Sequence, residues 1–129
     1  MFNSIKTSKE NKQVVTQLTN KLNLGAENTI ARLAFSYSLA RERRLDLSDI
    51  EDAGGKEYTS RVLFGDHLDI YVALICVHYG IAKEDKDIGR YVKMHIDDGL
   101  QLINKDISKK DTITGNDFLI NEIEKGLMA

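Results

Sequence analysis

Histidines are the first residues to consider for chemistry, because imidazole is the commonest metal-binding side chain in proteins. Two of the three histidines have carboxylates nearby, in the segments His67-x-Asp69 and His95-x-Asp97-Asp98. On a helix, residues two apart point about 200° away from each other, so neither segment can enclose an ion alone. We therefore expect no metal site, and we interpret these side chains as helix caps and surface polar groups.

The usual signs of nucleophilic and nucleotide chemistry are missing from the sequence. Cys76, the single cysteine, stands between Ile75 and Val77, and we interpret it as a small core residue. No GxSxG nucleophile elbow, GxxxxGK[ST] phosphate loop or GxGxxG motif occurs. The acidic run from Asp46 to Asp52 lacks the ligand spacing of a calcium-binding loop and is typical of a solvated turn. We therefore predict a protein that is not an enzyme and needs no cofactor.

The composition indicates one well-solvated domain over residues 1–129, with 42% hydrophobic and 29% charged residues. The longest apolar run, Ile70 to Val77, has eight residues, far fewer than the roughly 20 that span a bilayer. The first dozen residues contain no apolar stretch of the kind that a signal peptide needs. With only one cysteine, these features predict a cytoplasmic protein that does not bind membranes.

Charge is distributed unevenly along the chain. Residues 1–44 hold eight basic and three acidic side chains, a net charge of +5, whereas the rest of the chain carries −7. A basic segment of this kind indicates a nucleic-acid footprint, although ordinary solvated helix faces produce the same pattern. The candidates for contact with DNA phosphates are Lys6, Lys9, Lys12, Lys21, Arg41, Arg43 and Arg44. Such contacts would give a salt-sensitive affinity that is independent of base sequence.

The elements that position these residues begin with a short strand within residues 2–6. Thr7 is then the expected N-cap of a helix, with Glu10 completing a capping box. The apolar stripe of this helix consists of Val14, Val15, Leu18 and Leu22. After a turn ending at Gly25, a second helix is expected from Ala26 to Arg43. It is apolar on two sides, which predicts packing within the domain or against a second subunit.

The remainder of the chain, which contains no proline, is also predicted to be mostly helical. Residues 45–55 form an acidic turn or short helix, and residues 56–64 are either extended or a loop. A third helix, His67 to Tyr79, is capped by Asp66 and apolar nearly all round, so we expect it at the domain centre.

Two further helices complete the predicted fold. The fourth runs from Glu84 to Asn104 and carries the stripe Ile88, Val92, Ile96, Leu100 and Ile103. The last is capped by Thr114 and built on Leu119, Ile123 and Leu127. The predicted fold is an all-α bundle of about five helices with a short N-terminal strand.

Two resemblances bear on function. The order strand, helix, glycine turn, helix over residues 2–43 resembles a ribbon-helix-helix unit, which would make the protein a transcriptional regulator. The second rests on LGAENTIARLAFSYSLA (Leu24 to Ala40), GGKEY (Gly54 to Tyr58) and RVLFGDH (Arg61 to His67). These segments resemble the DndE family of bacterial DNA sulphur-modification proteins, and the similarity spans roughly residues 10–100.

The second resemblance implies a place in the machinery that replaces a non-bridging phosphate oxygen of DNA with sulphur. It implies a non-catalytic accessory subunit that binds duplex DNA, nicked duplexes included, and that self-associates as a tetramer. Sulphur mobilisation and nucleotide activation would belong to other proteins of the sulphur-modification complex. The family offers no catalytic residues to transfer. A scaffold that contacts only proteins, without DNA, is the remaining alternative.

Overall fold

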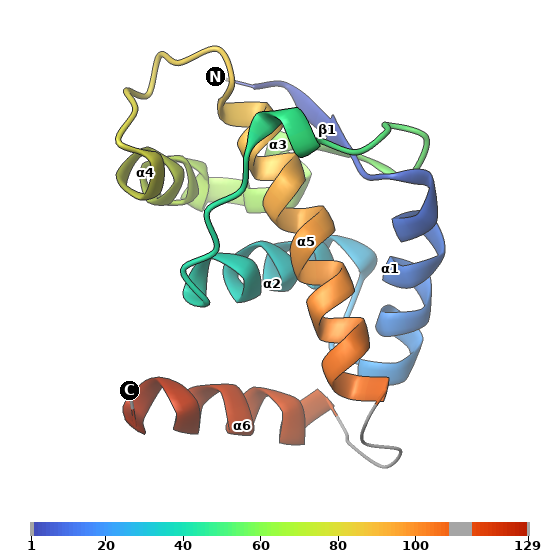
Figure 1. Ribbon diagram of the computed structural model, residues 1–129. Helices are drawn as coiled ribbons and strands as arrows, with labels where there is room; N and C mark the ends of the chain where they lie inside the picture. Colours follow the sequence, from blue (N-terminus) through green and yellow to red (C-terminus); the bar gives the residue numbers. More distant parts are fainter. Residues whose placement is uncertain (1, 109–114, 129) are drawn as a thin grey trace.

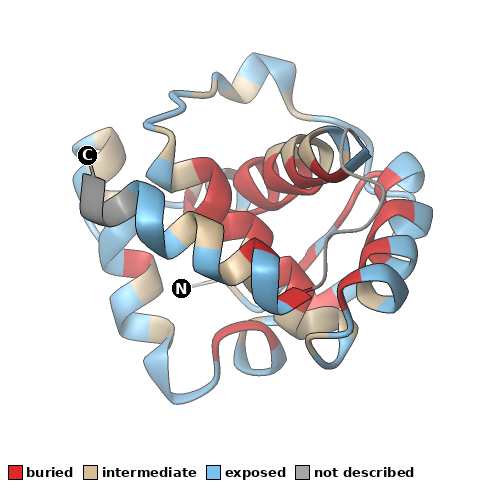
Figure 2. Ribbon diagram, turned by 90° about the horizontal axis from the view of Figure 1, so that it is seen from below, coloured by how far each residue is buried: buried red, intermediate tan, exposed pale blue. Residues whose placement is uncertain are grey.

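Helix α5 (Ile88–Ser108) runs through the middle of the molecule, and the other elements pack around it (Figure 1). The computed structural model describes residues 2–108 and 115–128. Buried positions follow the length of α5, whereas helices at the periphery expose one face to solvent (Figure 2). The predicted apolar stripe of this helix is confirmed, because all five of its members are buried. The all-α fold is confirmed as well, although α5 begins at Ile88 rather than at Glu84.

Helix α2 (Glu27–Ala40) crosses α5 at very short distance. A Cβ atom added to Gly99 of α5 would lie 1.8 Å from the carbonyl oxygen of Ala34, so only glycine permits this approach. The two-sided apolar pattern of α2 is explained within the chain, because Ile30, Ala34 and Phe35 are all fully buried. This pattern therefore does not by itself require a second subunit.

The end of α2 lies three residues before the predicted one, at Ala40 instead of Arg43. Arg41 begins a turn, and Glu42 has a φ of 56°, a left-handed conformation through which an α-helix cannot continue. The acidic segment that follows contains the short 3-10 helix η1 (Leu47–Asp49). The three arginines therefore lie on a turn after the helix and not on its last turn.

Strand β1 (Ser4–Lys6) pairs antiparallel with β2 (Glu57–Thr59), and Ile5 lies opposite Tyr58. The predicted N-terminal strand is confirmed. The segment 56–64, which the sequence left open, contains β2 followed directly by the short helix α3 (Ser60–Phe64). The pairing brings the N-terminus and the middle of the chain to one side of α5 (Figure 1).

Helix α1 (Lys9–Leu22) is capped by Ser8 and not, as predicted, by Thr7. The hydroxyl oxygen of Ser8 accepts a hydrogen bond of 3.2 Å from the backbone N–H of Asn11. Thr7 is used elsewhere, because its hydroxyl oxygen accepts a bond of 2.9 Å from the backbone N–H of Lys56. The capping prediction was wrong by one position, since a contact distant in sequence occupies the threonine.

Helix α4 (Leu68–Tyr79) lies at the edge of the molecule, so the prediction that it forms the domain centre is wrong (Figure 1). Its buried side chains are those of Val72 and Ile75. Its exposed apolar side chains, which we call the α4 ridge, are Ile70, Leu74 and Val77. A helix that is apolar nearly all round can be enclosed or can present an apolar surface, and α4 presents one: the side chain of Val77 is 84% exposed.

The chain around α4 forms a continuous apolar stretch. Residues Ser60–Tyr79, comprising α3, the 3-10 helix η2 (Gly65–His67) and α4, are long and apolar enough to cross a membrane by length and composition alone. A core helix of a soluble protein passes the same test. Here α3 packs on α2 and α4 packs on α5, so the stretch is part of the folded domain. Asp66, the predicted cap, lies inside η2, whereas Gly80 ends α4 in the left-handed conformation.

Helix α6 (Gly115–Met128) packs against α1 and α2 on the side of the molecule away from β1 (Figure 1). Its predicted cap, Thr114, lies outside the described residues, as does the side chain of Leu127. The predicted apolar face is buried only in part, because Leu119 is half-buried against the core while the side chain of Ile123 is 62% exposed. Phe118, which was not part of that face, is buried.

Candidate nucleic-acid interface

The basic residues predicted to contact DNA fall into two groups. The lysine group consists of Lys6 on β1 and of Lys9 and Lys12 on α1. The arginine group consists of Arg41, Arg43 and Arg44 on the turn after α2. In Figure 1, α1 and the C-terminal end of α2 lie on different sides of α5. The seven residues therefore do not form one continuous surface.

Lys21 belongs to neither group. It lies in the last turn of α1, twelve residues after Lys9, which corresponds to about 18 Å along the helix axis. At about 100° per residue it points roughly 180° away from Lys12 around the helix. Lys21 is exposed, but it cannot contact the same stretch of DNA backbone as Lys9 and Lys12.

The lysine group presents free charges to solvent. Lys9 and Lys12 are three residues apart on one face of α1, and both are exposed. Neither ammonium group has a hydrogen-bond or ion-pair partner among the described residues. Lys6 lies 3.6 Å from a carboxylate oxygen of Glu57, and both side chains are 52% exposed, so this pair holds the lysine only weakly.

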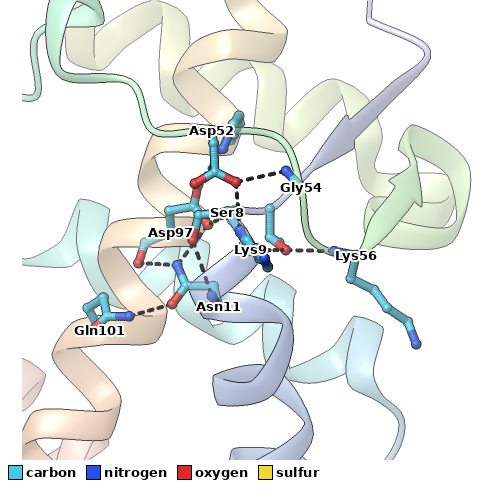
Figure 3. Close-up of polar contacts among 10 residues, drawn as sticks. Ser8, Lys9, Asn11, Asp52, Gly54, Lys56, Asp97 and Gln101 are labelled. Atoms are coloured by element: carbon cyan, nitrogen blue, oxygen red, sulfur yellow. Dashed lines mark hydrogen bonds and ion pairs between the residues drawn. The ribbon is translucent and has the colours of Figure 1, made fainter.

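Two carboxylates fix the start of α1 beneath these lysines (Figure 3). Oδ1 of Asp97 accepts the backbone N–H of Ser8 at 3.0 Å and the side-chain amide of Asn11 at 2.8 Å. Oδ2 of Asp52 accepts the backbone N–H groups of Gly54 and Lys9, each at 2.9 Å, and these bonds lower the pKa of Asp52. Because the N–H groups of Ser8 and Lys9 are occupied, a phosphate would have to be bound through the lysine side chains.

Lys56 is a basic neighbour of the lysine group that the sequence analysis missed. The strand pairing sets Lys6 opposite Glu57, and the backbone N–H of Lys56 is bonded to Thr7. Its ammonium group is 3.2 Å from a carboxylate oxygen of Glu27. The sequence signal that could have revealed this neighbour is the alternation of polar and aromatic residues in Glu57, Tyr58 and Thr59, which is typical of a half-buried strand. Such a strand would place Lys56 at its start.

Arg41 is held by two partners within the chain. Its Nη2 atom lies 3.1 Å from both carboxylate oxygens of Glu122, on α6. Its guanidinium carbon is 3.3 Å from the centre of the Tyr37 ring, a cation–π contact. The side chain of Arg41 is therefore oriented toward α6 and its charge is already neutralised.

Arg43 is paired as well, and only Arg44 of the described arginine group has no ion-pair partner. Nη2 and Nε of Arg43 donate to the two oxygens of Asp98 at 2.9 and 3.1 Å. Arg44 is exposed, with its guanidinium carbon 5.9 Å from the ring of Tyr79. Phosphate binding by the arginine group would thus depend on Arg44 unless one of the ion pairs opens.

A chain of hydrogen bonds anchors this arginine turn to the core. The Asp98 carboxylate accepts the hydroxyl hydrogen of Ser38 at 2.6 Å, so the Ser38 oxygen must accept from Nδ1–H of His95, at 2.8 Å. Nε2 of His95 is then an acceptor and receives the Tyr79 hydroxyl at 2.6 Å. The Tyr79 oxygen accepts the backbone N–H of Leu45 at 3.2 Å. Each donor in this chain has an acceptor, which assigns the hydrogen of His95 to Nδ1.

The serine, histidine and aspartate in this chain do not form an open catalytic site. Ser38 and His95 are fully buried, and burial, with a contribution from the nearby His78, lowers the pKa of His95 to about 4. The interpretation of His95 as a surface polar group is therefore wrong. Cys76 is half-buried and packs against the core rather than within it.

The described part of the chain shows no group of three or more histidine, cysteine, aspartate or glutamate side chains placed to hold a metal ion. The segments singled out in the sequence are separated, because His67 is exposed in η2 while Asp97 is bound to Ser8 and to Lys93. The carboxylates near His95 are thus engaged in structural contacts.

Comparison with known proteins assigns the chain to a family. The family described as DNA sulphur modification protein DndE matches it over residues 4–111. The chain belongs to the DndE family. The resemblance recognised in three sequence segments is thereby confirmed. The matched range includes every predicted DNA-contacting residue and ends before α6.

Solved DndE structures share the fold. The crystal structure of DndE from Escherichia coli B7A, involved in DNA phosphorothioation modification, is 20% identical with a TM-score of 0.64. A glycine-to-lysine double mutant of DndE, involved in DNA phosphorothioation, is 21% identical with a TM-score of 0.67. Each comparison covers 80% of this chain and 98% of the other chain. No curated protein matches the sequence.

Proposed function

We propose that this chain is a non-catalytic, DNA-binding accessory subunit of the DNA phosphorothioation machinery. Its membership of the DndE family carries the proposal, and the related crystal structures are of proteins involved in DNA phosphorothioation. The feature of this chain that supports DNA contact is the pair Lys9 and Lys12, exposed and without intramolecular partners in the described structure. DNA binding would be through phosphates, on duplexes with or without a nick.

A non-catalytic role fits the burial of the one serine and histidine pair that lies beside an aspartate in the described structure. Ser38 and His95 are fully buried, and the hydrogen-bond chain that they form with Asp98 holds the arginine turn in place. We propose that neither metal nor nucleotide is required. Treatment with a chelator should leave folding and DNA binding unchanged, whereas stoichiometric zinc or iron in the purified protein would contradict this.

We further propose that the protein is a homo-oligomer, a tetramer, and that it binds other proteins of the sulphur-modification complex in the cytoplasm. The α4 ridge supports a protein interface, because it leaves three large apolar side chains exposed on one helix. The same ridge would serve the scaffold alternative, in which the chain contacts proteins without contacting DNA.

The regulator alternative has less support. In a ribbon-helix-helix protein, N-terminal strands from two chains pair with each other to form the DNA-reading ribbon. Here β1 pairs with β2 of the same chain, and the side chains on the exposed side of β1 are those of Ser4 and Lys6. Few side chains on this strand could read bases.

Titration of fluorescently labelled duplexes over a series of salt concentrations tests these functions against one another. A phosphate-binding subunit should bind random duplexes of equal length alike, and log Kd should rise linearly with log salt concentration. A strong preference for one operator over random DNA would favour the regulator. Absence of binding to intact and nicked duplexes at low salt would favour the scaffold and exclude the proposed function.

A further inference from the structure

Helix α6 is an addition to the part of the chain that matches the DndE family. The family match ends at residue 111, and α6 begins at Gly115. The helix nevertheless packs closely on the family domain, because a Cβ atom at Gly115 would lie 2.0 Å from the carbonyl oxygen of Leu22 in α1. Phe118 is buried by this packing.

The contact between α6 and α2 is made by two adjacent interactions. The ring of Phe118 stacks on the ring of Tyr37 with a centroid separation of 5.6 Å. Four residues further along the chain from each ring, Glu122 binds the guanidinium of Arg41 through both carboxylate oxygens. The hydroxyl group of Tyr37 donates to Asp106 of α5, so the ring that both Phe118 and Arg41 contact is itself fixed. The two interactions align Glu122 with Arg41.

In this ion pair, Glu122 binds N–H donors of Arg41 that could otherwise bind a DNA phosphate. A guanidinium binds carboxylate and phosphate oxygens with the same N–H donors, so the two anions compete for it. The side chains of Arg41 and Glu122 are 27% and 23% exposed, so the pair is at the surface, where DNA could reach the arginine if α6 released it. Lys125, also on α6, lies 3.4 Å from Glu122 and is the other cation that depends on this carboxylate.

We propose that α6 is an intramolecular clasp in which Glu122 holds Arg41 out of contact with DNA and thereby lowers DNA affinity. The proposal rests on the proposed DNA-binding function and on membership of Arg41 in the arginine group. Opening of the Glu122–Arg41 pair adds one cation, beside Arg44, to the surface of this turn. A partner that displaced α6 would therefore strengthen DNA binding.

The test uses the full chain with single substitutions. Glu122→Gln removes the charge that holds Arg41 while retaining the size of the side chain. Glu124→Gln is the matched control, because Glu124 is an exposed residue of the same helix with no side-chain partner among the described residues. Both variants change net charge equally, so any difference between them reports the ion pair. Arg41→Gln, alone and combined with Glu122→Gln, identifies the released cation.

We expect Glu122→Gln to raise affinity for a random duplex by about three- to tenfold at low salt, with a salt slope steeper by about 0.9. Glu124→Gln should change affinity less than about twofold without changing the slope. The gain should vanish when Arg41→Gln is combined with Glu122→Gln. Thermal melting of each variant checks that the domain remains folded.

The outcomes separate the clasp from the proposed function. If the wild-type protein binds DNA and Glu122→Gln raises the affinity for DNA no more than Glu124→Gln does, the clasp is wrong and the proposed DNA binding stands. A gain that persists in the Arg41→Gln background would assign the effect to Lys125 and also overturn the clasp. If neither the wild-type protein nor Glu122→Gln binds DNA at low salt, the proposed function is wrong and the clasp with it.

Discussion

The hydroxyl group of Tyr79 donates to Nε2 of His95 over 2.6 Å, and this direction is imposed by the rest of the hydrogen-bond chain. Nδ1–H of the same ring is directed at Ser38, whose own hydrogen is donated to Asp98. A second proton on His95 would place an N–H against the Tyr79 oxygen, which already accepts the N–H of Leu45. The neutral imidazole is therefore the form that fits the folded protein.

We expect stability to decrease as pH falls from about 7 to about 5. The pKa of His95 is about 4 in the folded protein, below its ordinary value of about 6.5 in the unfolded chain. The unfolded chain thus takes up the proton first as pH falls, and the free energy of unfolding drops by about 2 kcal/mol over this window. Urea denaturation at several pH values measures this change.

Two substitutions test whether His95 causes this pH dependence of stability. His95→Asn should remove most of the pH dependence, at the cost of lower stability at neutral pH. His67→Asn should leave the pH dependence as it is, because His67 is exposed. If the wild-type and His95→Asn proteins lose stability equally as pH falls, groups other than His95 cause the loss.

The lysine group is tested by reversing two charges. The double substitution Lys9→Glu and Lys12→Glu should weaken binding to all duplexes alike by about tenfold or more and make the salt slope shallower by about 1.8. Folding should be retained, since acidic residues are favourable in the first turn of a helix. Lys83→Glu with Lys105→Glu, an equal charge change at two exposed sites elsewhere, is the control. Equal weakening by both pairs would mean that α1 is not the contact site.

The α4 ridge predicts self-association that depends on an exposed valine. Val77 is 84% exposed in the single chain, so Val77→Glu should not unfold the domain but should dissociate the oligomer. Ile123→Glu, at a 62% exposed isoleucine on α6, should leave the oligomer intact. Sedimentation at micromolar concentration measures both. A wild-type protein that is only monomeric would remove the proposed homo-oligomer.

The close approach of α2 and α5 predicts a strong effect from one methyl group. Gly99→Ala should lower the free energy of unfolding by about 3 kcal/mol or more, because the new Cβ meets the rigid backbone of Ala34. Gly89→Ala, on the same helix, puts the new Cβ 2.8 Å from the Cβ of Phe2, so the segment that precedes β1 must shift. That variant should lose less stability than Gly99→Ala, because a segment outside the helices shifts more easily than two packed helices separate and because alanine improves helix propensity. Chemical denaturation distinguishes them; similar stabilities would show that the helices separate easily.

Local patterns in the sequence predicted the elements that are determined locally. The stripe of α5 is visible because its members recur at helical spacing and all face the core. The position of α4 could not be predicted in this way. Its apolar residues lie on all sides, and whether Leu74 and Val77 are covered depends on neighbours that the helix itself does not specify.

The candidate site was predicted by residue type but not by pairing. Basic character identified Arg41 and Arg43, yet their partners Glu122 and Asp98 are 81 and 55 positions away. No periodicity relates residues at such separations. The sequence therefore indicated where cations are concentrated, while the fold decided which of them are free to bind a phosphate.

The bond between Asp97 and the start of α1 has a consequence for synthesis of the protein. Ser8 and Asn11 are buried and share the carboxylate of Asp97, so the first helix cannot complete its polar contacts until α5 has been made. At about 5–20 residues per second, roughly 4 to 17 s separate translation of the two segments. During that interval the face of α1 that packs on α5 in the folded domain lacks this partner. Folding of this domain must therefore wait until most of the chain has been synthesised.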